Sequence, residues 1–495
     1  MNKFILRGSL GFLFLSVALS SCKSSQEVAA KKEPVGINLG YMDKSVNPAD
    51  DFNRYVNGTW LDKTEIPADR TRWGSFDELR KNTDNDVMAI LKEAINDKTI
   101  DPNSDQAKAI NLYKSVLDTV TRNKQGIEPL KPYLAKINAV QNADQLVALL
   151  AEMEPEMGLG FFGSYIGADA KNSNKNVIYV GTGSLGLPDR DYYVSDAPDN
   201  KEKREKYVAH VTRMLQFIGE SEATANANAK KILALETKMS TATLDRVQRR
   251  DRRNTYNPMS FADLQKLAPT VKWDTYFQSV GIGKVDSLVV SQPKYIQTVE
   301  TILKDNQVED WKAYMRWTAL RGSAGLLSTD IENANFDFYG KTLTGAVKQR
   351  PAEERALATV NGRLGEALGK LYVAKKFPPE AKEKAQAMIA NVMLAFDNRI
   401  NNLPWMTKAT KENAKIKLNK FRVKIGYPDK WKDYSELQVK SPEQGGTYFD
   451  NSRMYARWSH KKNIEKMGKP VDKEEWGMSP QTVNAYFSPT NNEIV

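Results

Sequence analysis

The two histidines of this 495-residue sequence are the first candidates for chemistry, since imidazole is the commonest general base and metal ligand. His210 lies beside apolar residues at helical spacing in KYVAHVTRML, so we expect it on a helix surface or partly buried. His460 lies among cations in ARWSHKKN, and we expect it to face solvent. Ser459 precedes His460 directly, but sequence neighbours on a helix point apart and form no catalytic pair. Because the sequence has only two histidines, a multi-histidine metal site is nearly excluded.

Other catalytic signatures are also missing from the sequence. It contains no Walker loop, no GxSxG elbow and no HExxH motif. The single cysteine, Cys22, rules out a disulfide framework or a thiolate metal cluster within the chain. Judged by motifs alone, the chain has no complete catalytic site.

A glycine pattern imitates a dinucleotide-binding loop. Gly181, Gly183 and Gly186 match GxGxxG directly after a strand-like run. A dinucleotide site needs a helix that begins at the third glycine and points its N-terminus at pyrophosphate. Pro188 would break such a helix, and no alternation of strands and helices surrounds the motif. We interpret the pattern as a glycine-rich turn.

Five arginines lie close together between positions 246 and 253, at Arg246, Arg249, Arg250, Arg252 and Arg253. Such a cluster can grip phosphates, but acidic residues interleave with it and no stacking aromatic residue follows directly. The net charge of +11 is also small for this length, so it does not demand a nucleic-acid partner. We prefer a helix end or interdomain hinge with ion pairs, and expect no nucleic acid to bind.

Residues 1–22 predict an export signal. Two basic residues precede an apolar segment at 10–19, which is too short to span a bilayer comfortably. The following Leu-Ser-Ser-Cys resembles a bacterial lipobox, in which Cys22 is acylated; an ordinary signal peptide with an incidental cysteine is the alternative. Residues 23–36 lack apolar periodicity and predict a flexible tether. We expect a lipid-anchored protein of the bacterial cell envelope, facing the periplasm or the exterior.

The rest of the chain predicts a mainly α fold with small β elements. Apolar residues recur at helical spacing over most of the body, and strand-like runs are few. Strands are expected at 176–180 and 483–487. Helices are expected at 87–95, 110–120, 146–153, 223–239, 380–400 and 407–421.

Several short stretches, taken in order, resemble the neprilysin and endothelin-converting-enzyme family of zinc metallopeptidases. No single stretch is specific for the family. Their occurrence in the family's order, from about residue 36 to 495, is specific. They are DFNRYVNGTW at 51–60, RWGSFDELR at 72–80, GLPDRDYY at 186–193, YNPM at 256–259, IGYPD at 425–429, WGMSPQTVNAYF at 476–487 and NNEIV at 491–495.

This resemblance implies two helical lobes of a neprilysin-like, gluzincin-type peptidase that face each other across a chamber. It places the N-terminal part of the catalytic lobe at 37–255, an inserted helical lobe at 256–439 and the return to the catalytic lobe at 440–495. The arginine cluster would then lie where the chain crosses between lobes. The resemblance also implies zinc as cofactor of the complete enzyme and short peptides as substrates.

The departures from the family pattern are as informative as the matches. Ala49 and Asn57 stand where animal members have disulfide cysteines, so stability must come from packing. Family members continue past the NAY motif into a helix with HExxH, followed by a glutamate ligand and a late histidine. This sequence has none of these, and His210 and His460 match none of their positions. We therefore expect the N-terminal portion of such a peptidase, without the zinc-binding subdomain, as a truncated product or a partial sequence.

The resemblance still assigns substrate-binding residues, although it assigns no catalytic or metal-binding residue to this chain. Residues 483–487 would form an edge strand to which an extended peptide adds through backbone hydrogen bonds. Asn484 would contact the substrate backbone with its amide, and Ala485 with its carbonyl. Arg72 and Asp77 would lie near the primed end of the substrate, where a guanidinium can hold a carbonyl or carboxylate. Arg80 is a weaker candidate for the same cluster.

Structural alternatives exist for each of these residues. Asn484 and Ala485 could belong to a purely structural strand. Arg72 and Asp77 could form no more than a salt bridge at a helix start. Phe76 could wall a side-chain pocket, but we expect a core aromatic residue.

Two functions follow from this. The first is a lipid-anchored zinc metalloendopeptidase that cleaves short peptides on the amino side of apolar residues, with this chain inactive alone. The second is a non-catalytic, lipid-anchored module that binds peptides or partners. The oligomeric state is not determined by the sequence.

Overall fold

The computed structural model describes residue 36 and residues 38–495. The expected signal segment, Cys22 and almost all of the tether lie outside these residues. Two compact units divide the chain, one ending at Glu65 and the other running Ile66–Val495. The lobe boundaries expected at 255/256 and 439/440 stay predictions. No helix of the described residues combines the length and apolar character that crossing a bilayer requires.

The first unit is built around one helix. It contains η1 (Leu39–Tyr41) and α1 (Phe52–Lys63). The Asp51 side chain caps α1 by accepting the Arg54 N–H. Thr59 Oγ1 donates to the Met42 carbonyl at 2.7 Å, and Asn57 Nδ2 donates to Asn53 Oδ1 at 3.0 Å. Local hydrogen bonds therefore hold this unit at a position where the resemblance expects a cysteine.

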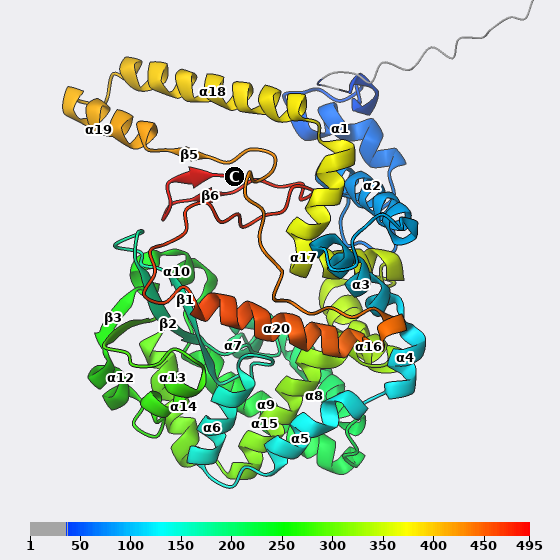
Figure 1. The fold of residues 1–495 in the computed structure, drawn as a ribbon, viewed down its shortest axis with the longest axis vertical. Helices are drawn as coiled ribbons and strands as arrows, with labels where there is room; N and C mark the ends of the chain where they lie inside the picture. Colours follow the sequence, from blue (N-terminus) through cyan, green and yellow to red (C-terminus); the bar gives the residue numbers. More distant parts are fainter. Residues whose placement is uncertain (1–35, 37) are drawn as a thin grey trace, which may run out of the picture. The chain divides into compact units, whose positions relative to one another are not determined.

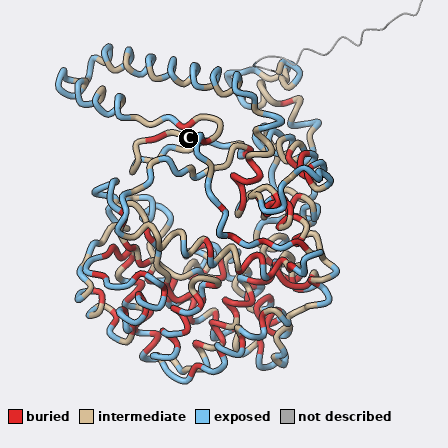
Figure 2. The backbone as a smooth tube through the Cα atoms, viewed as in Figure 1, coloured by how far each residue is buried: buried red, intermediate tan, exposed pale blue. Residues whose placement is uncertain are grey.

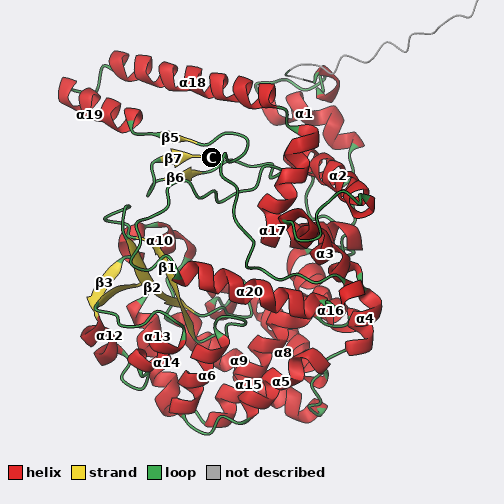
Figure 3. Ribbon diagram, in the orientation of Figure 1, coloured by secondary structure: helices red, strands yellow, loops and turns green. Residues whose placement is uncertain are grey.

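Helices dominate the second unit, which confirms the mainly α prediction (Figures 1 and 3). Each predicted helix is present, and the bounds of 146–153, 223–239, 380–400 and 407–421 agree within a few residues. The helix expected at 87–95 is the end of a longer one that begins at Ser75, and the range 110–120 crosses a break between two helices at Asp118. The first half contains α2 (Ser75–Asn96), α3 (Asp105–Leu117), α4 (Thr119–Gln125), η2 (Glu128–Leu130), α5 (Lys131–Asn138), α6 (Ala143–Met153), α7 (Arg190–Val194), α8 (Pro198–Gln216), α9 (Glu222–Thr241), α10 (Arg246–Arg250) and α11 (Arg252–Thr255). The second half contains α12 (Phe261–Leu267), α13 (Trp273–Ser279), α14 (Pro293–Asp305), α15 (Val308–Ser323), η3 (Ala324–Leu326), α16 (Thr329–Phe336), the π-helix η4 (Asp337–Thr342), α17 (Ala352–Lys376), α18 (Pro379–Asn402), α19 (Lys408–Asn419), η5 (Pro442–Gln444) and α20 (Tyr448–Ile464).

A four-stranded sheet lies among these helices. Its order is β1-β2-β4-β3, from β1 (Phe162–Ala168), β2 (Asn176–Thr182), β4 (Ser287–Val290) and β3 (Asn257–Ser260). The β1–β2 and β3–β4 pairs are antiparallel, whereas β2 and β4 are parallel. The strand expected at 176–180 is confirmed as β2.

A second, three-stranded sheet contains the C-terminal residues of the chain. Its order is β5-β7-β6, from β5 (Arg422–Val423), β7 (Glu493–Ile494) and β6 (Phe487–Ser488). The strand expected at 483–487 is wrong in its range, because ladder pairing begins only at its last residue. The reason is local: the Asn484 N–H bonds to the Thr482 carbonyl, and the Asn484 side chain accepts the Ala485 N–H. These short-range bonds compete with the strand ladder.

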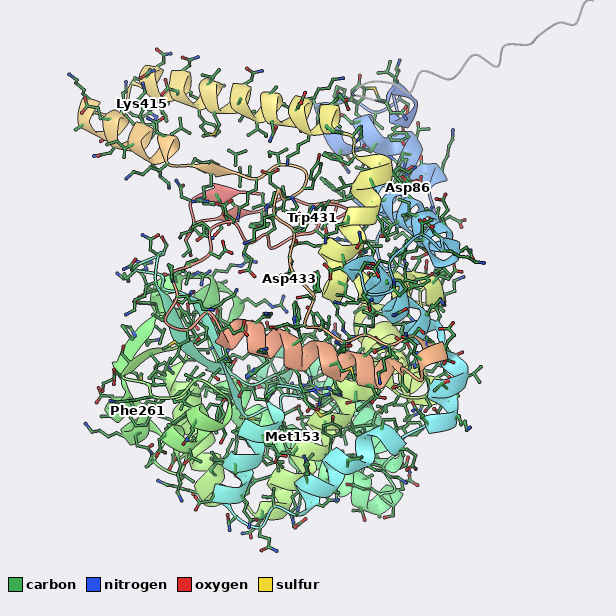
Figure 4. The ribbon with its side chains drawn as sticks, in the orientation of Figure 1. Asp86, Met153, Phe261, Lys415, Trp431 and Asp433 are labelled. Atoms are coloured by element: carbon green, nitrogen blue, oxygen red, sulfur yellow. The ribbon has the colours of Figure 1, made fainter. Side chains whose placement is uncertain are left out.

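Buried residues concentrate in α3, α6, α8, α9, α14 and α15, where large aromatic side chains such as Tyr207, Tyr314 and Trp317 are fully enclosed (Figure 2). In contrast, α18 has no buried residue and exposes apolar side chains such as Phe396. Ion pairs connect neighbouring helices: Lys415 Nζ of α19 lies 3.1 Å from Asp397 Oδ1 of α18, and Lys376 Nζ of α17 lies 2.8 Å from Asp86 Oδ1 of α2. Lys415 and Asp86 are labelled in Figure 4. The enclosed core is one cluster of buried residues that extends from the helices around the four-stranded sheet to α2, α3, α17 and α20.

Candidate functional site

Asn484 and Ala485 are exposed, and the segment that carries them is anchored on both sides. Before them, the buried Gln481 side chain donates to Asn361 Oδ1 at 2.7 Å and to the Gly365 carbonyl at 3.0 Å, both on α17. After them, Tyr486 and Val495 exchange two backbone hydrogen bonds of 3.0 Å. The structure therefore presents both predicted residues to solvent from a fixed backbone.

Their polar groups differ in availability. The Asn484 side-chain oxygen accepts the Ala485 N–H at 2.8 Å, so part of its hydrogen-bonding capacity is used within the segment. Within residues 66–495, the structure shows no hydrogen bond donated by the side-chain amide of Asn484 or accepted by the Ala485 carbonyl. This geometry leaves one donor and one acceptor for an added peptide backbone. The anchors that fix them, Gln481 and Tyr486, lie within the NAY stretch but were not predicted as such.

Arg72, Asp77 and Arg80 form one cluster at the start of α2. Arg72 Nε lies 3.8 Å from Asp77 Oδ2, and Arg80 Nη1 lies 3.7 Å from Asp77 Oδ1. Asp77 occupies the first turn of α2, where the helix dipole favours a negative charge. The Arg72 side chain is 78% exposed, so its guanidinium keeps its donors accessible. The helix-start salt bridge is present, and a substrate contact by Arg72 stays a prediction.

Phe76 is not the core aromatic residue that we expected. It is 69% exposed in the first turn of α2. The buried face of α2 begins only at Val87 and continues through Ile90 and Leu91. The start of the helix lies outside that buried stripe, which explains the error. Within residues 66–495, no hydrogen bond or ion pair joins the Arg72–Asp77–Arg80 cluster to Asn484 or Ala485.

His210 is buried, whereas we expected it on a helix surface or only partly buried. Its ring stacks on Phe338 with centroids 4.7 Å apart, and its edge meets Trp317 at 5.6 Å. Burial lowers the pKa of His210 to about 3, and the nearby charge of Arg213 adds to this. The imidazole is therefore neutral at physiological pH and enclosed by aromatic rings.

His460 is partly buried rather than solvent-facing, which corrects the second expectation for a histidine. Its Nε2 atom lies 2.8 Å from the Val280 carbonyl oxygen, so this nitrogen is occupied by the backbone. Outside the undescribed residues 1–35 and 37, no three His, Cys, Asp or Glu side chains come together as a metal site. A zinc centre needs at least three such ligands. The described residues therefore do not fit the zinc site that the resemblance implies for the complete enzyme.

The arginine cluster is confirmed as an ion-paired helix end. Arg246 Nε and Arg249 Nη2 lie 2.9 Å and 2.7 Å from the same Asp189 oxygen. Burial opposes ionisation of Asp189, but the hydrogen bond from Arg246 and the two positive charges outweigh it and lower its pKa. Arg253 pairs with Asp251 at 2.6 Å. Asp189 belongs to the Gly186–Tyr193 stretch, so these ion pairs connect the arginine-rich helix end to that stretch.

The glycine pattern is confirmed as a turn. The next helix, α7, begins only at Arg190. A Cβ atom on Gly183 would lie 1.5 Å from the Gly160 carbonyl oxygen, and one on Gly186 would lie 1.8 Å from Tyr207 Oη. Close packing therefore demands these two glycines, and no phosphate is needed to explain them.

Comparison with known proteins places these features in a family. A family model described as "Peptidase family M13" matches residues 48–428. Neprilysin-3 of Drosophila melanogaster is 31% identical over 481 residues, covering 92% of this chain and 61% of its own length. Endothelin-converting enzyme 1 of Cavia porcellus is 28% identical over 477 residues, covering 92% of this chain and 62% of its own length. The chain thus spans less than two thirds of these relatives.

A solved structure shows the same architecture. The zinc metalloprotease Zmp1 of Mycobacterium tuberculosis, crystallised in complex with an inhibitor, superposes with a TM-score of 0.85 and 34% sequence identity. The match covers 93% of this chain and 69% of that one. The neprilysin-like helical fold expected from the sequence is therefore confirmed.

Proposed function

Because the chain belongs to peptidase family M13, we propose that it forms the peptide-binding part of a zinc-dependent metalloendopeptidase acting on short peptides. The family match across residues 48–428 carries this proposal. The preferred substrates have an apolar residue on the carboxyl side of the cleaved bond.

In this proposal, the anchored segment before β6 aligns the substrate. The Asn484 amide donates to a backbone carbonyl of the peptide, and the Ala485 carbonyl accepts a peptide N–H. Such main-chain contacts read an extended shape with little sequence preference. Arg72 holds a carbonyl or carboxylate of the substrate toward its primed end. Asp77, which lies near both Arg72 and Arg80, orients the Arg72 guanidinium. Orientation of the scissile bond is the contribution of these residues.

Zinc in the complete family enzyme supplies the activated water for hydrolysis. Neither histidine of this chain is placed to hold it, since His210 is enclosed by aromatic rings and His460 contacts the Val280 carbonyl. We therefore expect the 495-residue chain to bind peptides without hydrolysing them. A lipid on Cys22 would keep it at a membrane of the bacterial cell envelope, facing the periplasm or the exterior.

Calorimetric titration with a short, extended, apolar peptide tests the proposal. The chain should bind it, and Asn484→Ala should weaken binding by about five- to tenfold, the effect of one hydrogen bond. Asn398→Ala, at an exposed asparagine of α18, is the matched control and should leave affinity unchanged. Equal peptide affinity of the Asn484→Ala and Asn398→Ala variants would show that this segment does not bind the peptide. Zinc-dependent, chelator-sensitive turnover by the purified chain would contradict its expected inactivity.

The second candidate is a non-catalytic, lipid-anchored module that captures peptides or partners. The commitment of both histidines to other contacts favours it. The DNA sequence downstream of codon 495 separates the two candidates. A reading frame that continues into HExxH supports the peptidase, whereas a stop codon supports the binding module.

A further inference from the structure

A polar cavity lies beside α20, and none of its lining residues belongs to the Asn484 segment. It has a volume of about 410 Å³ and is bordered by α17, α20, the end of α15 and the loop after α6, elements labelled in Figure 1. We call it the arginine pocket, after two of its lining residues. Its polar lining includes Glu154, Glu156, Arg363, Ser452, Arg453 and His460.

Arg453 is a buried cation in this pocket without a carboxylate partner. Its side chain is 7% exposed, and no Asp or Glu oxygen of the described residues lies within 4.0 Å of its nitrogens. Nη1 donates to the Glu156 carbonyl at 2.8 Å, Nη2 donates to Ser323 Oγ at 2.6 Å, and Nε has no partner. The rings of Phe449 and Tyr133, with centroids 4.7 Å and 5.7 Å from the guanidinium carbon, stabilise this charge in part. They supply no counterion, and a buried charge without one is costly unless a ligand supplies it.

Arg363 adds a second unpaired cation. Its Nη1 donates to Ser452 Oγ at 2.6 Å, and the described residues offer it no ion pair. It precedes Leu364, where α17 departs from helical geometry with φ −122° and ψ 35°. The helix therefore bends at the residue next to this arginine.

The acidic residues of the pocket are occupied elsewhere. Glu156 pairs with Arg457 at 2.6 Å and accepts the Tyr133 hydroxyl at 2.5 Å. Glu154 accepts the backbone N–H and the hydroxyl of Ser164, each at 2.9 Å, and the Tyr276 hydroxyl. Burial raises the pKa of Glu154, and its hydrogen bonds with Tyr276 and Ser164 oppose this in part. Among the described residues, neither carboxylate forms an ion pair with Arg363 or Arg453, although the Glu156 charge favours the charged form of Arg453.

Electrostatics agree with this geometry. Burial lowers the pKa of Arg453, Tyr133 and Glu156 offset this in part, and the positive charges of Arg363 and Arg457 lower the pKa further. Since a guanidinium stays charged in proteins, the pocket keeps a surplus of positive charge. A bound anion would relieve both the repulsion and the missing counterion.

We propose that the arginine pocket binds one carboxylate of a peptide, supplied by a free C-terminus or by an Asp or Glu side chain. A carboxylate matches the planar donors of arginine, and the volume admits one or two residues. The proposal rests on the proposed function for its ligand class, and gives those peptides an anionic anchor.

Titration of the full chain with four short peptides tests this. The peptides combine a free or amidated C-terminus with a glutamate or a glutamine side chain. We expect the peptides with a carboxylate to bind about tenfold or more tightly than the amidated glutamine peptide. Preference for the free C-terminus or for the glutamate identifies the source of the carboxylate. Equal affinity for all four peptides would overturn the proposal.

Two variants remove the charge. Arg363→Met loses the hydrogen bond to Ser452 and the cation–π contact with the Tyr448 ring, whose centroid lies 5.5 Å from the guanidinium carbon. It should still fold, as a cooperative thermal transition would show. It should abolish the preference for a carboxylate, as should Arg453→Met. Arg213→Met is the control, because this arginine pairs with Asp337 on the surface outside the pocket. Retention of the preference in a folded Arg363→Met variant would also overturn the proposal.

A smaller pair of probes separates the pocket from the proposed function. N-acetylalanine and N-acetylalanine amide differ by one carboxylate and are too short to span an extended site. N-acetylalanine should bind the wild-type chain and not Arg363→Met, detected by ligand-observed NMR. If it does so while no peptide interacts with the Asn484 segment, the pocket stands and the proposed function fails. If it does not bind while peptides do, the pocket proposal fails alone.

Discussion

Lys424 and Glu493 form a buried ion pair that joins β5 to β7. Lys424 Nζ lies 3.0 Å from Glu493 Oε2, and the two side chains are 7% and 3% exposed. Lys424 Nζ also donates to the Glu475 carbonyl at 2.8 Å. The pair lies directly after β5 and at the first residue of β7, whose neighbour β6 follows the exposed Asn484–Ala485 segment. It therefore ties the small sheet together beneath the candidate peptide-binding residues.

Removing the lysine should destabilise this sheet. Lys424→Met leaves the Glu493 carboxylate buried without its counterion, which costs about 3–5 kcal/mol. The double variant Lys424→Met/Glu493→Leu should recover most of this loss, because no unpaired charge remains. Chemical unfolding of the three proteins measures both effects. A double variant no more stable than the single one would show that the pair does more than neutralise charge.

Gly183 should tolerate no side chain. In Gly183→Ala, the added Cβ would meet the Gly160 carbonyl oxygen at 1.5 Å, so the backbone must move. We expect a loss of about 3 kcal/mol in the free energy of unfolding. Gly181→Ala is the matched control: its nearest atom would be the Gly163 carbonyl oxygen at 4.0 Å, and its effect should stay within about 1 kcal/mol. Similar losses for both variants would refute the steric explanation.

His210 should make the protein less stable in mild acid. Its pKa is lowered to about 3 in the folded state by burial and by Arg213, while an unfolded histidine titrates near 6.5. The unfolded chain therefore binds a proton first, so stability is complete above pH 6.5 and falls as the pH drops toward 3. From pH 7 to 5 the loss amounts to about 2 kcal/mol. Thermal unfolding of wild type and His210→Phe across this range should differ in pH slope by that amount, and parallel slopes would contradict the burial effect.

Arg72 should affect binding much more than stability if it contacts substrate. Its ion pair with Asp77 is long, at 3.8 Å, and its own side chain is 78% exposed, so Arg72→Gln should change the unfolding free energy by less than about 0.5 kcal/mol. The same variant should weaken binding of a short peptide severalfold. Lys266→Gln, which removes a comparable exposed pair with Asp263 on α12, is the control for both measurements. Unchanged peptide affinity in Arg72→Gln would show that Arg72 does not contact the peptide and only forms the salt bridge with Asp77.

The secondary structure was predictable where one periodicity dominates. Helix α9 and strand β2 follow 3.6-residue and two-residue patterns, and both were predicted within a few residues. The strand at 483–487 failed because Asn484 bonds to its own neighbours, a local choice that apolar alternation does not encode. His210 failed for a different reason: a helix shows which residues share a face, but not that Phe338 and Trp317 will close over that face.

The sequence by itself determined the helical class, the family resemblance and the residue types available for chemistry, because these depend on local pattern and on the order of motifs. Only the tertiary structure decided which charges meet: Asp189 with two arginines, Glu493 with Lys424, and Arg363 beside Arg453 without a carboxylate for either. Such pairings join residues that are distant along the chain. Their energies depend on burial and separation, which no residue carries alone.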